Sequence, residues 1–249
     1  ARAAYVFDVR TGSILYEKNA EIQFPLASLA KVMSALVAHD IAPDATVTIT
    51  SEALAAEGDS GLLREERWNI SDLIDFTLMT SSNDGARALA SVGASFANKN
   101  SSLEHTFINR MNEKARALGM VQTFFLNETG LDEDGKTPGA YGSAKDVATL
   151  FTYIIHTKPD LFLATTRERA SISSFDASHT ATNTNIITSK IPGLVASKTG
   201  FTDLAGGNLA VAFEAGPLRP VIIVVLGSTE GGRFQDVEAL VEASIRAIQ

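Results

Sequence analysis

Strand patterns occur at the two ends of the chain, and helix patterns fill its middle. The opening stretch AAYVFDVRTGSILYEKNA has two β-rich runs around the turn sequence Arg10-Thr11-Gly12, which predicts a hairpin. Short apolar or alternating runs return late in the chain, in ERASISSF, LVASKTG, GNLAVAFEA and RPVIIVVLGS, before a last helix, FQDVEALVEASIRAIQ. The distant ends are therefore expected to meet in one mixed sheet, with the helical segments inserted between them.

The middle of the chain, from Ser28 to about Thr157, predicts mainly helices because apolar residues recur there at helical spacing. The helical stretches are FPLASLAKVMSALVAHD, ISDLIDFTLMTSSNDGARALASVGAS, SSLEHTFINRMNEKARALG and SAKDVATLFTYIIHT. Helix caps are expected at serines that precede acidic residues, namely Ser71, Ser102 and Ser143. We expect one domain over residues 1–249, with a mainly helical subdomain at about residues 51–157.

Composition excludes several classes of function. A net charge of −8 and a pI near 5.0 argue against a nucleic-acid partner. No run reaches the roughly 20 apolar residues of a membrane span, and no signal peptide opens the given chain. Cysteine is absent, so no disulfide, thiolate nucleophile or sulfur ligand is available. No metal or other cofactor is expected, because metal-ligand spacing is also missing among the histidines, His39, His105, His156 and His179.

The stretch Phe24–Asp40 predicts a helix that is apolar on almost every side and yet carries a lysine. At about 100° per residue, Ser28 and Lys31 lie on one face, one turn apart, so their side chains can touch. Burial would lower the pKa of the lysine and leave a neutral amine beside the hydroxyl, which together make an activated nucleophile. Taken alone, the pair also fits an N-cap serine after Pro25 and a lysine that extends to solvent.

Two further motifs place polar side chains where the helical or strand pattern of the sequence is interrupted. Ser81-Ser82-Asn83 lies between two helical stretches, where a hydroxyl and a carboxamide can project into a cleft. Lys198-Thr199-Gly200, at a strand edge, combines a cation and a hydroxyl with a position that has no side chain. Each motif alone is explained by a helix cap or a strand end. Together with Ser28 and Lys31, and in this order, they match the motif set of β-lactamases and penicillin-binding proteins.

The chain resembles, in particular, the low-molecular-mass penicillin-binding proteins of the D-alanyl-D-alanine carboxypeptidase type. The likeness also includes the opening hairpin and the stretches NETGLDEDGKTPGAYGSAKDVA and KTGFTDLAGGNL. Ser82 departs from this family's frequent glycine, and the C-terminal β-rich domain and amphipathic anchor of many relatives are missing from the given chain. The resemblance implies a mixed α/β fold of the β-lactamase and transpeptidase type, with an antiparallel sheet flanked by helices.

The resemblance implies catalytic roles for residues of all three motifs. Ser28 would attack the carbonyl between two D-alanines, and Lys31 would take its proton, giving an acyl-enzyme that water resolves. Ser81 and Asn83 would complete the proton relay and hold the substrate amide. The backbone N–H groups of Ser28 and Phe201 would form the oxyanion hole.

The same resemblance implies a binding site for the terminal carboxylate. Lys198, which is counted among the catalytic residues, and Thr199 would bind the carboxylate region, next to the side-chain-free Gly200. Arg233, in GSTEGGRFQD, aligns with an arginine that reaches the substrate carboxylate in this family. Its alternative is a solvated residue near the start of a helix.

The implied function is that of a serine DD-peptidase, which cleaves peptidoglycan stem peptides ending in D-Ala-D-Ala outside the cytoplasm and is acylated by β-lactams. The alternatives are a DD-endopeptidase acting on cross-links, a β-lactamase, and a non-catalytic β-lactam sensor. A class A β-lactamase needs a glutamate that activates the deacylating water, and Leu126-Asn127-Glu128 has the wrong order for it. Gly58-Asp59-Ser60-Gly61 resembles the serine region of trypsin-like proteases, but only His39 precedes it, and we interpret it as a loop.

Overall fold

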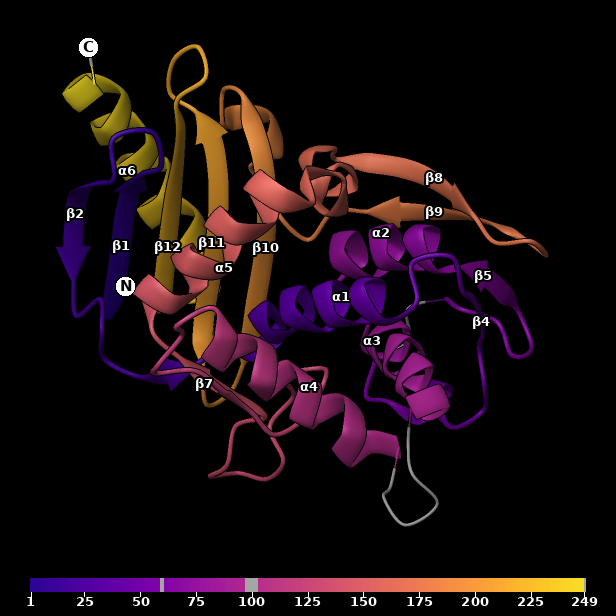
Figure 1. Ribbon diagram of the computed structural model, residues 1–249. Helices are drawn as coiled ribbons and strands as arrows, with labels where there is room; N and C mark the ends of the chain where they lie inside the picture. Colours follow the sequence, from indigo (N-terminus) through magenta and orange to yellow (C-terminus); the bar gives the residue numbers. More distant parts are fainter. Residues whose placement is uncertain (59–60, 97–102, 249) are drawn as a thin grey trace.

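A five-stranded sheet with the order β10-β11-β12-β1-β2 forms the centre of the computed structural model, which describes residues 1–58, 61–96 and 103–248 (Figure 1). Its strands are β1 (Ala3–Asp8), β2 (Ser13–Lys18), β10 (Leu194–Thr202), β11 (Gly206–Glu214) and β12 (Pro220–Ser228). The pairing of β1 with β12 joins the two ends of the chain, as expected. All neighbouring strands are antiparallel, so the expectation of mixed strand directions is wrong; short turns join β1 to β2 and link β10, β11 and β12.

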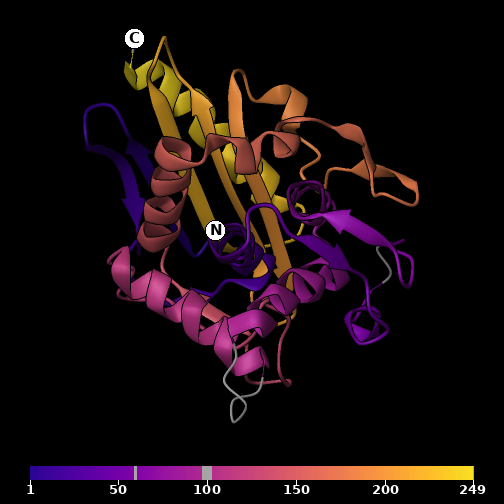
Figure 2. The same ribbon diagram turned by 45° about the vertical axis from the view of Figure 1, so that its right-hand side comes forward.

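Both faces of this sheet are covered, which explains why its central strands are apolar at nearly every position. Alternate residues of β12 belong to different cores. Ile222 and Val224 lie in the core that includes α5 (Ala144–Thr157), whereas Ile223 and Val225 lie in the core that includes α6 (Gly232–Ile248). Figures 1 and 2 show α5 and α6 on opposite faces of the sheet. The expected arrangement of an antiparallel sheet flanked by helices is confirmed.

The other helices pack around α1 (Ala30–Ile41), beside the sheet. They are α2 (Ile70–Thr80), α3 (Asn83–Ala90) and α4 (Leu103–Ala117), and all three contact α1 (Figure 1). A helix enclosed in this way is apolar on nearly every side, as its sequence is. The subdomain at about residues 51–157 stays a prediction, and α5, which that range includes, packs on β12 and β1.

Short strands and 3-10 turns, which are too short to show a period in the sequence, connect these elements. The short strands are β3 (Phe24–Pro25), β4 (Thr46–Thr48), β5 (Arg67–Asn69), β6 (Phe124–Phe125), β7 (Ala140–Gly142), β8 (Arg169–Ser173) and β9 (Ser178–Thr182). The 3-10 turns are η1 (Ala27–Leu29), η2 (Ala53–Ala55), η3 (Ser91–Phe96), η4 (Pro159–Phe162), η5 (Ala164–Thr166) and η6 (Thr188–Lys190). Strand β8, expected from ERASISSF, pairs only with β9 and not with the main sheet, and this hairpin extends beyond α2 (Figure 1).

The predicted helix caps are partly correct. Ser143 caps α5, because its Oγ accepts a hydrogen bond from the backbone N of Asp146 at 3.1 Å. The cap of α2 is Asn69 and not Ser71; its side chain accepts from the Ser71 backbone N at 2.9 Å. The helix begins earlier than expected because Ile70 is buried and belongs to its first turn. Ser102 lies outside the described residues.

Several expectations concern parts of the chain away from the three motifs. None of the helices in the described ranges has both the length and the apolar character that crossing a membrane requires. In the same ranges, histidine, aspartate and glutamate side chains form no group of three or more that could hold a metal ion. Asp59 and Ser60 of the Gly-Asp-Ser-Gly segment, and the side chain of His105, lie outside the part that the structure describes.

Candidate active site

The 3-10 turn η1 carries Ser28 immediately before α1. The residue before it, Ala27, has φ 50°, a left-handed conformation that is uncommon for a residue with a side chain. Lys31 Nζ lies 2.9 Å from Ser28 Oγ, so the structure brings the two side chains together, as their spacing predicts. Ser28 is not a helix cap, because the cap positions are Leu26 and Leu29 and neither makes a side-chain cap bond.

The Lys31 amine is enclosed by oxygen atoms and does not extend to solvent. The residue is 0% exposed, and Nζ contacts Asn83 Oδ1 at 2.6 Å and the Thr129 carbonyl oxygen at 2.7 Å, besides Ser28. Burial lowers the pKa of Lys31 to about 7, against the opposing effect of the negative charge on Glu128. The neutral amine is therefore well populated at neutral pH, and it is a base in contact with the serine hydroxyl.

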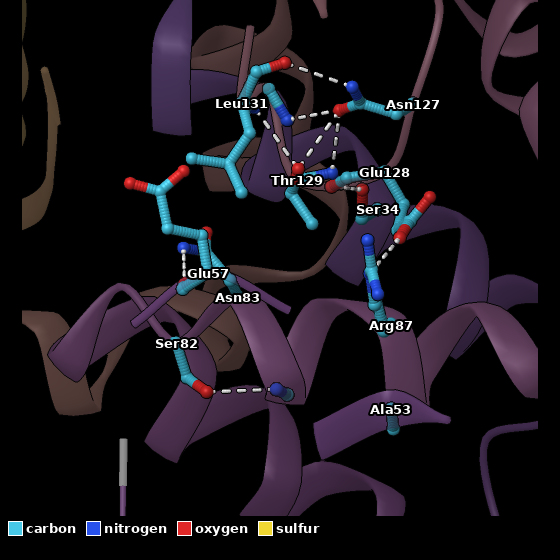
Figure 3. Close-up of polar contacts among 12 residues, drawn as sticks. Ser34, Ala53, Glu57, Ser82, Asn83, Arg87, Asn127, Glu128, Thr129 and Leu131 are labelled. Carbon is cyan, nitrogen blue, oxygen red and sulfur yellow. Dashed lines mark hydrogen bonds and ion pairs between the residues drawn. The ribbon is translucent and has the colours of Figure 1, made fainter. Parts of the chain in front are cut away.

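The side chains of the second motif point to different partners. Ser81, at the end of α2 with φ 61°, accepts a hydrogen bond on Oγ from Lys198 Nζ at 2.7 Å. Ser82 caps the first turn of α3 and so stabilises that helix. Asn83 Nδ2 donates to the Glu57 carbonyl oxygen at 2.7 Å, as Figure 3 shows, and its Oδ1 is left to accept from the lysine on α1. The motif thus connects the lysines of the other two motifs.

Strand β10 carries the third motif at the edge of the sheet. Lys198 is 1% exposed, and its Nζ donates to Ser81 Oγ and to the Thr199 carbonyl oxygen at 2.8 Å. Burial and the positive charges of Lys31 and Arg233 hold the pKa of Lys198 well below its usual value. On this strand side of the site, around Lys198 and Thr199, the protonated form of the lysine is therefore disfavoured unless an anion binds beside it.

Gly200 allows β10 to approach the backbone around the nucleophile. A Cβ on this residue would lie 2.9 Å from the Leu26 carbonyl oxygen and 3.2 Å from the Ser28 backbone N. Asn208 on β11 holds the same segment, since its Nδ2 donates to the Leu26 carbonyl at 3.0 Å. Phe201 follows Gly200 and is 44% exposed, so its side chain is at the surface beside this close approach.

Arg233 is buried against β10, so the alternative interpretation of this residue as solvated is wrong. It is 7% exposed, and Nη1 donates to the Gly200 carbonyl oxygen at 2.7 Å. Its Nε is buried with no hydrogen-bond partner among the described residues. Thr184, after β9, was missed from the sequence; its Oγ1 lies 2.6 Å from Thr199 Oγ1. The two hydroxyls beside the Lys198 amine suit an anionic ligand, whose charge would favour the protonated form of that amine.

A turn beginning at Asn127, which the motifs did not include, also reaches the site. Asn127 Oδ1 accepts from the backbone N of Gly130 at 2.7 Å and from Thr129 Oγ1 at 3.0 Å (Figure 3). The Thr129 carbonyl of this turn contacts the buried lysine. The carboxylate of Glu128 faces Arg87, with 3.7 Å between Oε1 and Nε (Figure 3). The sequence signal for this turn is Asn-Glu-Thr-Gly, although nothing in it indicates which carbonyl reaches the site.

Comparisons with known proteins identify the family of this chain. A family model described as D-alanyl-D-alanine carboxypeptidase matches residues 1–230. The D-alanyl-D-alanine carboxypeptidase DacF of Bacillus subtilis is 28% identical over 249 residues, which are 97% of this chain and 61% of DacF. The chain thus spans about three fifths of that relative's length.

Two solved structures share the fold. Penicillin-binding protein D2 from Listeria monocytogenes, in its ampicillin-bound form, is 32% identical with a TM-score of 0.82, covering 98% of this chain and 96% of that one. A D-alanyl-D-alanine carboxypeptidase from Mycobacterium tuberculosis H37Rv is 25% identical with a TM-score of 0.85, covering 99% of this chain and 91% of that one. The fold and the family resemblance expected from the motifs are therefore confirmed.

Proposed function

The chain belongs to the D-alanyl-D-alanine carboxypeptidase family, and from that premise we propose that it is a serine DD-peptidase. It cleaves the terminal D-Ala-D-Ala bond of peptidoglycan stem peptides through an acyl-enzyme, and β-lactams acylate it. The observation that carries the proposal is the Lys31 amine, which is buried, has a pKa of about 7 and lies 2.9 Å from Ser28 Oγ. Its place of action is outside the cytoplasm, because peptidoglycan is there.

Acylation begins with transfer of the Ser28 hydroxyl proton to the neutral amine of Lys31. Ser28 Oγ then forms a bond to the carbonyl carbon, and the negative oxygen is stabilised by the backbone N–H groups of Ser28 and Phe201. When the carbon–nitrogen bond breaks, the leaving D-alanine takes up the proton that Lys31 accepted, relayed through Ser81, which is hydrogen-bonded to Lys198; Lys31 is then neutral again. Asn83 orients Lys31 and holds the substrate amide.

The terminal carboxylate binds on the strand side. The hydroxyl of Thr199, the positive charge of Lys198 and the guanidinium of Arg233 surround this part of β10. Gly200 leaves space for the substrate backbone to lie along the edge strand. The ampicillin-bound form of the Listeria relative supports acylation of this chain by β-lactams.

Hydrolysis of the ester requires a water that reaches its open face. We assign no carboxylate to this step, since Glu128 is paired with Arg87. A released D-alanine diffuses away and lets water enter, whereas an opened penicillin ring stays attached and blocks it. A penicillin adduct is therefore expected to persist.

Intact-mass measurement after incubation with penicillin tests the proposal. One lasting adduct per chain is expected, on the peptide that contains Ser28, with Ser28→Ala as the unreactive control. A chain that never forms the adduct would refute the assignment of Ser28. Rapid return of the unmodified mass with excess hydrolysed penicillin would indicate a β-lactamase.

The substrate preference is tested by comparing the turnover of purified linear muropeptides with that of cross-linked ones. Release of D-alanine from linear stem peptides is expected. Cleavage of cross-links alone would indicate an endopeptidase. Acylation without any peptide turnover would indicate a sensor.

A further inference from the structure

The Lys31 amine has more hydrogen-bond partners than it can use as a donor when it is neutral. A neutral amine has two N–H groups and one lone pair. Asn83 Oδ1 and the Thr129 carbonyl only accept hydrogen bonds, so they take the two N–H groups. The lone pair is then directed at Ser28, whose hydroxyl can donate. The position of the Thr129 carbonyl therefore decides whether the base faces the nucleophile.

One amide group organises the turn that carries this carbonyl. Asn127 Oδ1 accepts from the Thr129 backbone N at 3.2 Å, from Thr129 Oγ1 at 3.0 Å and from the Gly130 backbone N at 2.7 Å. Its Nδ2 donates to the Leu131 carbonyl at 2.9 Å and to Glu133 Oε1 at 2.5 Å. Figure 3 shows the Asn127 amide beside Thr129 and Leu131, on the side of the turn away from Arg87. Both ends of the amide are occupied by the turn itself.

The turn is also fitted against the backbone of the nucleophile. Gly130 has φ 75°, and a Cβ there would overlap the Ala27 carbonyl oxygen, next to Ser28. The Glu128 carbonyl accepts from Ser34 Oγ on α1 at 2.6 Å. A shift of the turn would therefore move the Thr129 carbonyl relative to both the lysine and the serine.

We propose that Asn127 is a positioning residue for the catalytic base: its amide holds the turn so that the Thr129 carbonyl directs the Lys31 lone pair at Ser28. The inference rests on the proposed function. It assigns to Asn127 an effect on the rate of acylation, beyond any effect on the stability of the fold.

The test variant is Asn127→Ala, followed by the time course of labelling with a fluorescent penicillin. We expect the acylation rate constant to fall about 10- to 100-fold, as for small displacements of reacting groups, while nearly every chain is labelled in the end. A merely structural role would lower the labelled fraction and leave the rate constant of the remaining chains unchanged. The thermal midpoint is measured on the same samples.

Asn112→Ala is the matched control. Asn112 is buried, and its amide bonds the Ile108 carbonyl and both backbone groups of Phe125, which leads into the same segment. Within the described part of the chain, its hydrogen bonds go to these two residues and not to the turn that carries Thr129. This variant is expected to lower the thermal midpoint and to keep the parent rate constant.

Two further variants keep the test decisive if Asn127→Ala does not fold. Gly139→Ala introduces a Cβ that overlaps the Asn127 amide and the Leu131 carbonyl, so it is expected to slow acylation without removing the amide. Asn127→Asp combined with Glu133→Gln keeps the accepting oxygen and reverses the donor and acceptor of the pair. This double variant still loses the hydrogen bond to the Leu131 carbonyl and is expected to recover part of the rate, whereas Asn127→Asp alone also places two carboxylates in contact and is expected to be slower.

Each outcome favours or overturns the inference. A parent rate constant in both Asn127→Ala and Gly139→Ala would overturn it, and so would an equal loss of rate in Asn112→Ala. A parent chain that takes up no penicillin would overturn the proposed function, and this inference with it.

Discussion

The helix side and the strand side of the site each bury one lysine, in different surroundings. On the helix side, Lys31 has three oxygen partners, and the negative charge of Glu128 opposes the effect of burial, so its pKa is about 7. On the strand side, Lys198 has two oxygen partners, and the positive charges of Lys31 and Arg233 add to the effect of burial. Burial alone therefore does not set the behaviour of these two amines.

This difference indicates that the two sides of the site have different roles. The helix side is balanced so that the amine gains and loses a proton near neutral pH, as a general base must. On the strand side, burial and two neighbouring positive charges disfavour the protonated form of Lys198, which an anion would stabilise on binding. Variants on the two sides are therefore expected to affect proton transfer and carboxylate binding separately.

Removing the base is expected to have the largest effect. Lys31→Ala should lower the rate constant of penicillin acylation by about 100- to 10,000-fold, because no other group takes the Ser28 proton. The time course of adduct formation measures this. Val32→Ala, at the next and equally buried position of α1, is the control and should lose stability while keeping acylation. Acylation of Lys31→Ala at the parent rate would give Lys31 a purely structural role.

Removing a cation from the strand side is expected to have an intermediate effect that depends on the substrate. Arg233→Ala should reduce kcat/KM for peptides with a free terminal carboxylate by about 10- to 150-fold, the equivalent of a lost charge-assisted bond of roughly 1.5 to 3 kcal/mol. Penicillin acylation should fall less. The exposed Arg246 on the same helix provides the control, Arg246→Ala, with no change in either rate. Equal losses on peptide and penicillin would reject a carboxylate-specific role.

The change of the acylation rate with pH is expected to be the smallest effect. It directly tests the protonation of Lys31 on the helix side. With a pKa of about 7, Lys31 is mostly protonated at pH 6 and mostly neutral at pH 8. The acylation rate constant should therefore rise about tenfold between those values and then level off. Glu128→Gln removes the charge that raises this pKa, so the rise should move to lower pH. A flat profile in the parent would contradict the assignment of Lys31 as the base.

Local sequence patterns predicted the structural features that depend on residues close together in the chain. The hairpin of β1 and β2 follows from alternation around a turn, and the contact of Ser28 with Lys31 follows from one helical turn of separation. The burial of Lys31 follows from a helix that has no polar face. That the three motifs, with Asn83, form one site was predicted only because together they resemble a known family.

Tertiary packing decided what depends on residues far apart in the chain. The Thr129 carbonyl at Lys31, 98 residues away, and the Thr184 hydroxyl at Thr199 have no local pattern that indicates them. The burial of Arg233 depends on where α6 meets the sheet, because its own neighbourhood is polar. Dihedral preferences and side-chain period act over a few residues, so the sequence by itself determined the elements and the Ser28–Lys31 pair. The charges and carbonyl groups that tune this pair came from packing between distant segments.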